Sequence, residues 1–200
     1  ETFLRLGQNR SAYVLFRDLA EDDTLADEHR GNAHFRWLLA TNALEDWADL
    51  LTIALSFRER YPEHPRLPRG LFLTAYAHEQ QREYPTAIRL LTELMVTFPT
   101  HELAPRWRFQ RGLNHTFAEQ YEEGRSDFTR YLVDQPNGRQ ADLAKLWLGL
   151  TFFFDRRYEA ALGQFDRALG EIDPRSPVRP ELFYRRANTL YAMRDYENAL

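Results

Sequence analysis

Histidine offers this chain its widest range of chemistry, because a neutral imidazole can ligate a metal or act as a general base. No two histidines stand one helical turn apart, and no His-Glu-x-x-His pattern occurs. His78 and His115 are 37 residues apart and lack the carboxylate or thiol company that a metal site needs. We therefore expect packed, hydrogen-bonded imidazoles and no bound metal. The six histidines are His29, His34, His64, His78, His101 and His115.

Acidic and hydroxyl side chains do not form a recognisable catalytic group either. The densest acidic stretch is Glu21-Asp22-Asp23 with Asp27 and Glu28, but it lacks the glycine and the alternating ligands of a calcium loop. It is therefore interpreted as a solvated turn. The sequence has no Gly-rich phosphate loop and no Gly-x-Ser-x-Gly elbow. We predict no catalytic residues, no cofactor and no enzymatic activity.

The composition favours a folded protein whose partner is another protein. The chain has 200 residues, of which 44% are hydrophobic and 14% aromatic, enough to bury a core. Its net charge of -4 argues against nucleic acid, since phosphate neutralisation needs a basic surface. No apolar run reaches the roughly 20 residues of a membrane span. There is no cysteine, which excludes disulfides and thiol chemistry but fits either an oxidising or a reducing compartment.

The chain begins at Glu1 without a methionine and stops at Leu200, just after a helix is expected to start. An array of helices that ended there would leave an apolar face uncovered. We therefore expect this sequence to be a fragment of a longer protein.

Tyrosine and proline recur at a nearly constant step along the chain. A period of this length is typical of a solenoid built from helix pairs, a shape that presents a long surface to another molecule. The step is 37 residues, with one step of 38 at the end of each series, in Trp47, Tyr84, Tyr121, Tyr158 and Tyr196 and in Pro62, Pro99, Pro136 and Pro174.

The segment Leu143–Pro174 shows the repeat as a pair of helices. Its first half is apolar nearly all round and carries a small residue, Gly149, while its second half keeps apolar residues on one face. Proline follows the second half because it cannot continue the helical hydrogen bonds. Small residues at the Gly149 position allow two antiparallel helices to approach closely. The second-half residues are Tyr158, Ala161, Leu162, Phe165, Ala168 and Leu169.

These residue types, in this order, resemble a tetratricopeptide repeat. The resemblance covers about residues 30–200 and implies an all-α, right-handed superhelical solenoid of antiparallel helix pairs. We expect one array over 1–200, with a degenerate N-terminal unit at 1–29, repeats at 30–66, 67–103, 104–140 and 141–178, and a truncated repeat at 179–200.

The repeats are three residues longer than usual, and the excess follows the proline, as in Phe98-Pro99-Thr100-His101. This lengthened turn is similar to the repeats of bacterial cell-envelope assembly proteins, such as the lipoprotein subunit of the outer-membrane barrel-insertion machine and the coordinator of the Tol–Pal system. The similarity implies a periplasmic or cell-envelope location, with the cytoplasm as the alternative.

The resemblance also implies which residues of each first helix line the concave groove. Nearly all of them are apolar or aromatic, so a clamp for an acidic C-terminus is not expected, and an amphipathic or apolar segment of a protein or peptide partner fits better. The predicted partner-binding residues are Phe35, Leu39, Phe72, Tyr76, Phe109, Leu113, Phe117, Tyr184, Asn188 and Tyr191.

Three other interpretations stay open at this point. The large side chains could fill the groove themselves, as the segment from Leu146 to Phe154 suggests, since it resembles deep core. The apolar face could pair with a second copy in a homo-oligomer. The array could also be a passive arm of a larger enzyme.

Overall fold

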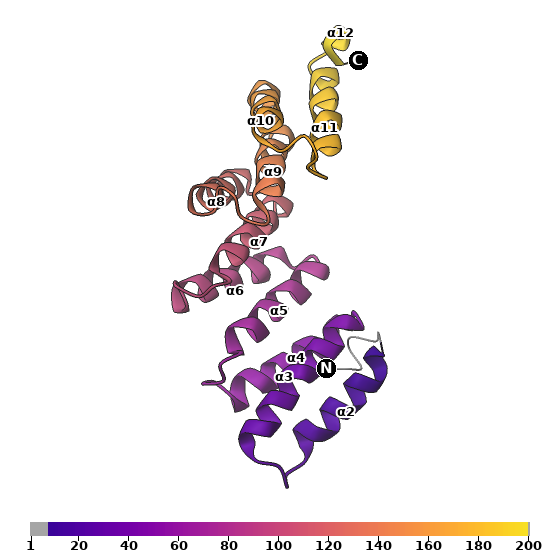
Figure 1. Cartoon of the computed structure of the whole chain (residues 1–200), viewed down its shortest axis with the longest axis vertical. Coiled ribbons are helices and arrows are strands. Elements are labelled where there is room, and N and C mark those ends of the chain that lie inside the picture. Colours follow the sequence, from indigo (N-terminus) through magenta and orange to yellow (C-terminus); the bar gives the residue numbers. More distant parts are fainter. Residues whose placement is uncertain (1–7, 200) are drawn as a thin grey trace. The chain divides into compact units, whose positions relative to one another are not determined.

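The computed structural model describes residues 8–199. Within this range every regular element is a helix, so the predicted all-α class is confirmed (Figure 1). None of the described helices is long and apolar enough to cross a membrane. The helices are α2 (Asn9–Glu21), α3 (Asp27–Ala43), α4 (Trp47–Arg60), α5 (Leu67–Gln80), α6 (Tyr84–Thr97), α7 (Ala104–Phe117), α8 (Tyr121–Asp134), α9 (Ala141–Phe154), α10 (Tyr158–Glu171), α11 (Arg179–Ala192) and α12 (Tyr196–Ala199).

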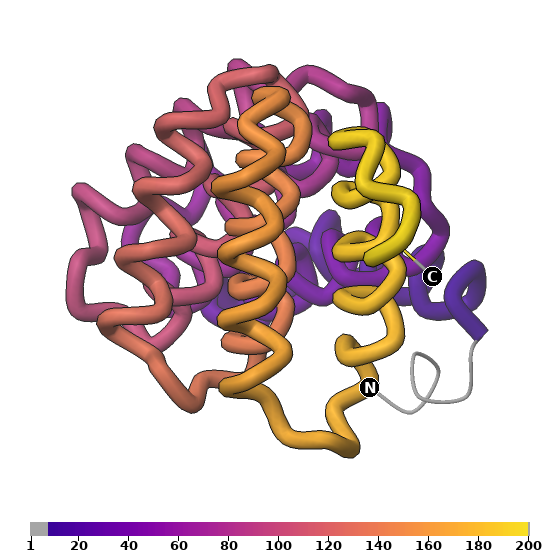
Figure 2. Tube along the Cα trace, turned by 90° about the horizontal axis from the view of Figure 1, so that it is seen from above, coloured from indigo at the N-terminus to yellow at the C-terminus, as the bar shows by residue number. Residues whose placement is uncertain are grey.

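The helices fall into two compact units, the first ending at Phe98 and the second beginning at Pro99. Within each unit, every helix packs against the next one along the chain, and α9 and α10 lie side by side in both views (Figures 1 and 2). The first helices of neighbouring pairs also touch: α3 packs against α5 in the first unit, and α9 packs against α7 and α11 in the second. Consecutive helix pairs are therefore the building block of both units.

The helices keep the spacing of the sequence repeat. First helices begin at Leu67, Ala104 and Ala141, 37 residues apart, and at Arg179, 38 residues later. Prolines lie in the first turn of α6, α7 and α11, where the missing N–H has no helical partner to lose. The predicted N-terminal unit extends beyond the described range, since residues 1–7 lie outside it.

Each unit is held together by apolar side chains between its helices. Fully burying one large apolar side chain stabilises a fold by about 1.5–3 kcal/mol. The first unit has two such clusters, one with Phe35, Leu38, Leu50, Ile53, Ala54, Phe57 and Ala77 and the other with Ala12, Phe16 and Ala40. The second unit has two such clusters, one with Phe109, Phe128, Tyr131, Ala141 and Ala144 and the other with Leu146, Leu150, Ala161, Phe165, Ala168, Ile172 and Leu182.

Close approach within a pair depends on the small residue of the first helix. Gly149 of α9 faces the fully buried ring of Phe165 on α10, and a β-carbon built at Gly149 lies 2.6 Å from one ring carbon and 3.0 Å from another. Both distances are below ordinary van der Waals contact. The prediction that a small residue allows the two helices to approach is therefore confirmed at this position.

The two helices of a pair are joined by three-residue turns with a common geometry. The middle residue of each turn has a positive φ between 57° and 64°. In the second unit, Glu119 donates its backbone N–H to Thr116 and Gln120 donates its own to His115, which together form a Schellman cap. The residues with positive φ are Glu45, Arg82, Glu119, Arg156 and Arg194.

The longer connections between pairs use the side chain that follows proline by two positions. The Nδ1 atom of His64 accepts a hydrogen bond from the backbone N–H of Arg66 at 3.1 Å. His101 does the same for Leu103 at 3.1 Å. In the last such loop, the hydroxyl of Ser176 accepts from Val178 at 3.4 Å. The side chain two positions after each of these prolines therefore fixes the backbone at the start of the next first helix.

Candidate partner-binding surface

Three of the ten predicted partner-binding residues belong to the core. The exposed fraction is 0% for Phe35, 5% for Phe72 and 3% for Phe109. The ring of Phe109 packs edge-on against Phe128 and Tyr131, with centroids 5.6 and 5.8 Å away. The prediction that these three phenylalanines line an open groove is therefore wrong.

The size of the neighbouring residues explains this correction. Phe109 shares its cluster with Ala141 and Ala144 of α9, whose small side chains leave room for an aromatic ring between α7, α8 and α9. On the first unit, the ring of Phe35 is covered by the guanidinium groups of Arg66 and Arg69, which lie 5.3 and 5.9 Å from its centroid. Large side chains at this helix position fill the space between pairs instead of facing solvent.

Three further predicted residues lie at the edge of the core. Leu39 and Leu113 are half-buried and pack against the clusters of the first and second unit, respectively. Tyr76 is half-buried too, and its ring meets Trp47 edge-on with centroids 5.8 Å apart. Each of these residues offers only part of its surface to a partner.

The remaining predicted residues are the ones that reach the surface. The exposed fraction is 40% for Phe117, 57% for Tyr184 and 67% for Tyr191, and Asn188 is half-buried. Phe154 of α9 is 42% exposed, although the sequence suggested deep core for this segment. All five residues lie on α7, α9 and α11, which are the first helices of the second unit.

The exposure of Tyr184 follows from what covers the equivalent residues. Phe109, Leu146 and Tyr184 are each the sixth residue of their helix. Phe109 is covered by α9, and Leu146 packs with Leu182 of α11. No helix among residues 8–199 takes that place over α11, and the guanidinium of Arg185 lies 5.3 Å from the centroid of the Tyr184 ring.

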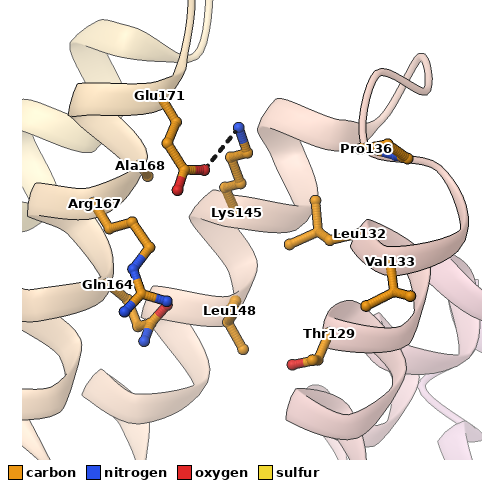
Figure 3. Close-up of a pocket in the computed structure, with 10 residues that line it drawn as sticks. All are labelled: Thr129, Leu132, Val133, Pro136, Lys145, Leu148, Gln164, Arg167, Ala168 and Glu171. Atoms are coloured by element: carbon orange, nitrogen blue, oxygen red, sulfur yellow. Dashed lines mark ion pairs between the residues drawn. The ribbon is translucent and has the colours of Figure 1, made fainter.

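A cleft of about 300 Å³ lies between α8 and α10, with α9 at its base (Figure 3). Its lining is apolar toward α8 and charged toward α10. Lys145 of α9, the only lysine in the sequence, pairs with Glu171 at 3.1 Å. The sequence did not predict this cleft, because it depends on how two second helices face each other. It is lined by Thr129, Leu132, Val133, Pro136, Lys145, Leu148, Gln164, Arg167, Ala168 and Glu171.

One buried carboxylate between α7 and α8 is approached by three basic side chains. Asp127 is 3% exposed and accepts two hydrogen bonds from Arg111, at 2.6 and 2.8 Å. Arg108 and His115 approach the same carboxylate to 3.8 and 3.9 Å. An ion pair with two parallel hydrogen bonds therefore joins α7 to α8. We interpret the cluster as structural, because it holds these two helices together.

The buried and half-buried histidines His34 and His78 lie within hydrogen-bonding distance of nearby protein oxygen atoms. His34 is 2% exposed, and its Nε2 lies 3.1 Å from the carbonyl oxygen of Ile53. Burial lowers the pKa of His34 to about 4, and the charge of Arg60 acts in the same direction, while the Ile53 carbonyl opposes it. His78 lies 2.6 Å from the carboxylate of Glu83, contrary to the expectation that it lacks carboxylate company. In residues 8–199 no three His, Asp or Glu side chains are grouped to hold a metal.

Comparison with known proteins identifies the fold. No protein-family model matches the sequence, and no curated protein matches it. A tetratricopeptide repeat protein from Parabacteroides merdae superposes with a TM-score of 0.77 at 17% identity, covering 99% of this chain and 72% of its own. The fold is that of a tetratricopeptide-repeat protein.

Two other solved structures agree with this conclusion. TPR-like repeats of a putative kinesin light chain from Podosopora anserina superpose with a TM-score of 0.71 at 10% identity, covering 88% of this chain and 92% of theirs. MamA from Desulfovibrio magneticus gives a TM-score of 0.69 at 14% identity, with coverage of 84% and 88%. The predicted tetratricopeptide-repeat resemblance is therefore confirmed at the level of the fold.

Proposed function

We propose that this chain is a protein-binding scaffold that presents exposed aromatic side chains of α9 and α11 to a partner. The observation that carries the proposal is the exposure of Tyr184, Tyr191 and Phe154, at 57%, 67% and 42%. Exposed aromatic groups on one layer of helices are a common mark of an interaction site. Tyrosine is also among the residues that contribute most to binding when a partner covers them.

The surroundings of these rings suit a segment with an apolar face and a polar edge. Asn188 lies between Tyr184 and Tyr191 along α11, one turn from each, and offers an amide to a partner backbone. Arg185 and Glu181 form an ion pair at 2.7 Å, and Arg185 lies beside the ring of Tyr184. An apolar centre with a polar rim is the usual arrangement of such interfaces. We therefore propose an amphipathic or apolar segment of a protein as the ligand.

A place in a bacterial envelope complex is part of the same proposal. It rests on the lengthened turn after each proline, in which His64, His101 and Ser176 accept a hydrogen bond from the chain two residues on. Fractionation of cells that produce the full-length protein tests this location. Recovery in the cytoplasm would contradict it without affecting the binding proposal.

The binding proposal is tested by placing a photo-crosslinking phenylalanine analogue at Tyr191 in the full-length protein. The matched control carries the analogue at Val96 of α6, which is 75% exposed. We expect one dominant protein adduct from position 191 and none of that mass from position 96. The adduct should disappear in the Tyr184→Ala background, since truncating a central interface residue costs at least about 2 kcal/mol of binding.

Two results would contradict the binding proposal. Equal adducts from both positions would mean that the aromatic residues of α11 have no special role. A crosslink between two copies of the chain would instead support the homo-oligomer alternative. Variants of Phe72 or Phe109 are unsuitable for this test, because both side chains are buried and their loss would affect folding.

A further inference from the structure

The cleft between α8 and α10 combines an open apolar strip with a positive charge. Leu132 and Leu148 are half-buried in it, and Val133 is 67% exposed at its edge. Figure 3 shows Arg167 of α10 beside Gln164, and Lys145 of α9 pointing toward Glu171. Because Lys145 pairs with Glu171, the charge of Arg167 remains in excess.

The corresponding helices of the first unit, α4 and α6, are joined by an ion pair that α8 and α10 lack. There, Arg58 is the twelfth residue of α4 and Glu93 the tenth residue of α6, and their side chains form an ion pair at 2.6 Å. In the second unit, the twelfth residue of α8 is Leu132 and the tenth residue of α10 is Arg167. The bridging ion pair between second helices is thus replaced by a leucine and an arginine, and a cleft opens beside them.

Arg167 has no carboxylate partner among the residues that the structure describes. The acidic residue one turn further along α10 is Glu171, whose carboxylate is already bound by Lys145. On the α8 side, Asp134 pairs with Arg130 at 3.0 Å. A guanidinium beside an apolar strip, with its neighbouring carboxylates engaged elsewhere, is complementary to an acidic group that arrives with an apolar one.

We propose that this cleft binds a peptide segment of a partner protein in which an acidic residue neighbours aliphatic residues. The carboxylate pairs with Arg167, where a guanidinium can form two parallel hydrogen bonds. An aliphatic side chain lies on Leu132, Leu148 and Val133. The cleft volume of about 300 Å³ is enough for one such side chain and its flanking backbone. The site lies on α8–α10, so it is independent of the aromatic residues of α11.

The test uses two amidated peptides, acetyl-Leu-Glu-Leu-Leu-amide and its glutamine counterpart, titrated into the ¹⁵N-labelled chain. We expect saturable chemical-shift changes at Thr129, Lys145 and Arg167 with a dissociation constant of about 1 mM, the weak range expected for so small a ligand. The glutamine peptide should bind about fivefold more weakly, since a partly exposed ion pair contributes about 1 kcal/mol. Arg167→Gln should remove this difference between the two peptides.

A double variant supplies a matched control for folding. Leu132→Arg with Arg167→Glu places the ion pair of the first unit across the cleft, and it should keep the circular dichroism and unfolding midpoint of the wild type. We expect it to bind neither peptide. Equal affinity for the two peptides, shift changes confined to α11, or unchanged binding by the double variant would each overturn the proposal.

Discussion

The phenol oxygen of Tyr131 accepts a hydrogen bond from the backbone N–H of Gln140 at 3.2 Å. In the other loops between pairs, this bond is made by the side chain two residues before the donor, as with His101 and Leu103. The loop before α9 has Gly138 at that position and no side chain to use. Tyr131, which lies on the preceding helix α8 and is 3% exposed, therefore supplies the acceptor that the loop lacks.

Tyr131→Phe should lower the free energy of unfolding by about 1–2 kcal/mol, because the partly buried N–H of Gln140 loses its acceptor. Urea denaturation followed by circular dichroism measures the change. A loss below about 0.5 kcal/mol would mean that solvent satisfies this N–H.

Gly138→Ser should be destabilising alone and less so in the Tyr131→Phe background. A β-carbon at Gly138 lies 2.7 Å from the hydroxyl of Tyr131 and 2.9 Å from the β-carbon of Gln135. Removing the hydroxyl relieves the first contact, and the serine can then accept from Gln140 as Ser176 does from Val178. We expect a coupling energy of about 1 kcal/mol in a double-mutant cycle. Additive effects would contradict this exchange of roles.

Asp127→Asn should lower the free energy of unfolding by about 3 kcal/mol, since the variant leaves Arg111 partly buried without its countercharge. The partly exposed pair between Glu181 and Arg185, neighbours within one helix, supplies a control, because Glu181→Gln should change stability by less than about 0.5 kcal/mol. Both are measured by urea denaturation. Similar small effects would indicate that Asp127 is dispensable to the packing of α7 on α8.

Two glycine substitutions should have opposite effects on thermal stability. Gly149→Ala places a methyl group against the buried ring of Phe165 and should cost about 1–3 kcal/mol. Gly163→Ala on α10 has no atom within 4 Å of the added carbon and should stabilise the helix by about 0.5–1 kcal/mol. Scanning calorimetry distinguishes them, and a stabilised Gly149→Ala would contradict the close packing of α9 on α10.

Stability should fall with acidification through His34. Its pKa is near 4 in the folded chain, against 6.5 for a free side chain, so the unfolded chain binds the proton first. The contribution is complete above pH 6.5, declines as the pH falls toward 4, and amounts to about 3 kcal/mol over that range. The difference in unfolding free energy between wild type and His34→Phe, measured from pH 8 to pH 4, should follow this curve. Parallel curves for the two proteins would show that His34 titrates normally.

The repeat could be predicted from the sequence because its signals are local. The recurring tyrosines mark the start of each second helix from α6 onward, and Gly149 marks the closest approach within its pair. These features depend on residues within one helix pair. The helix order and the pairwise packing follow from them.

The candidate site could be predicted only in part, because exposure depends on contacts between pairs. The burial of Phe109 depends on the small residues Ala141 and Ala144 of the next first helix. The exposure of Tyr184 depends on what covers α11. Periodicity alone assigns Phe109 and Tyr184 to the same position of the repeat, the sixth residue of the first helix. It therefore could not separate a core residue from a surface one.

The left-handed residue in each short turn determines where the chain can change length. A three-residue turn with a Schellman cap at Arg156 has no room for an extra residue, because an insertion would break the cap. The connections at the opposite end of the pairs are free of this constraint: residues 172–178 form a seven-residue loop where 135–140 form a six-residue one. That single insertion produces the 38-residue step, and loop entropy makes further lengthening there inexpensive. A tag, a protease site or a whole inserted domain therefore belongs in 172–178, where the helix pairs on both sides can keep their packing.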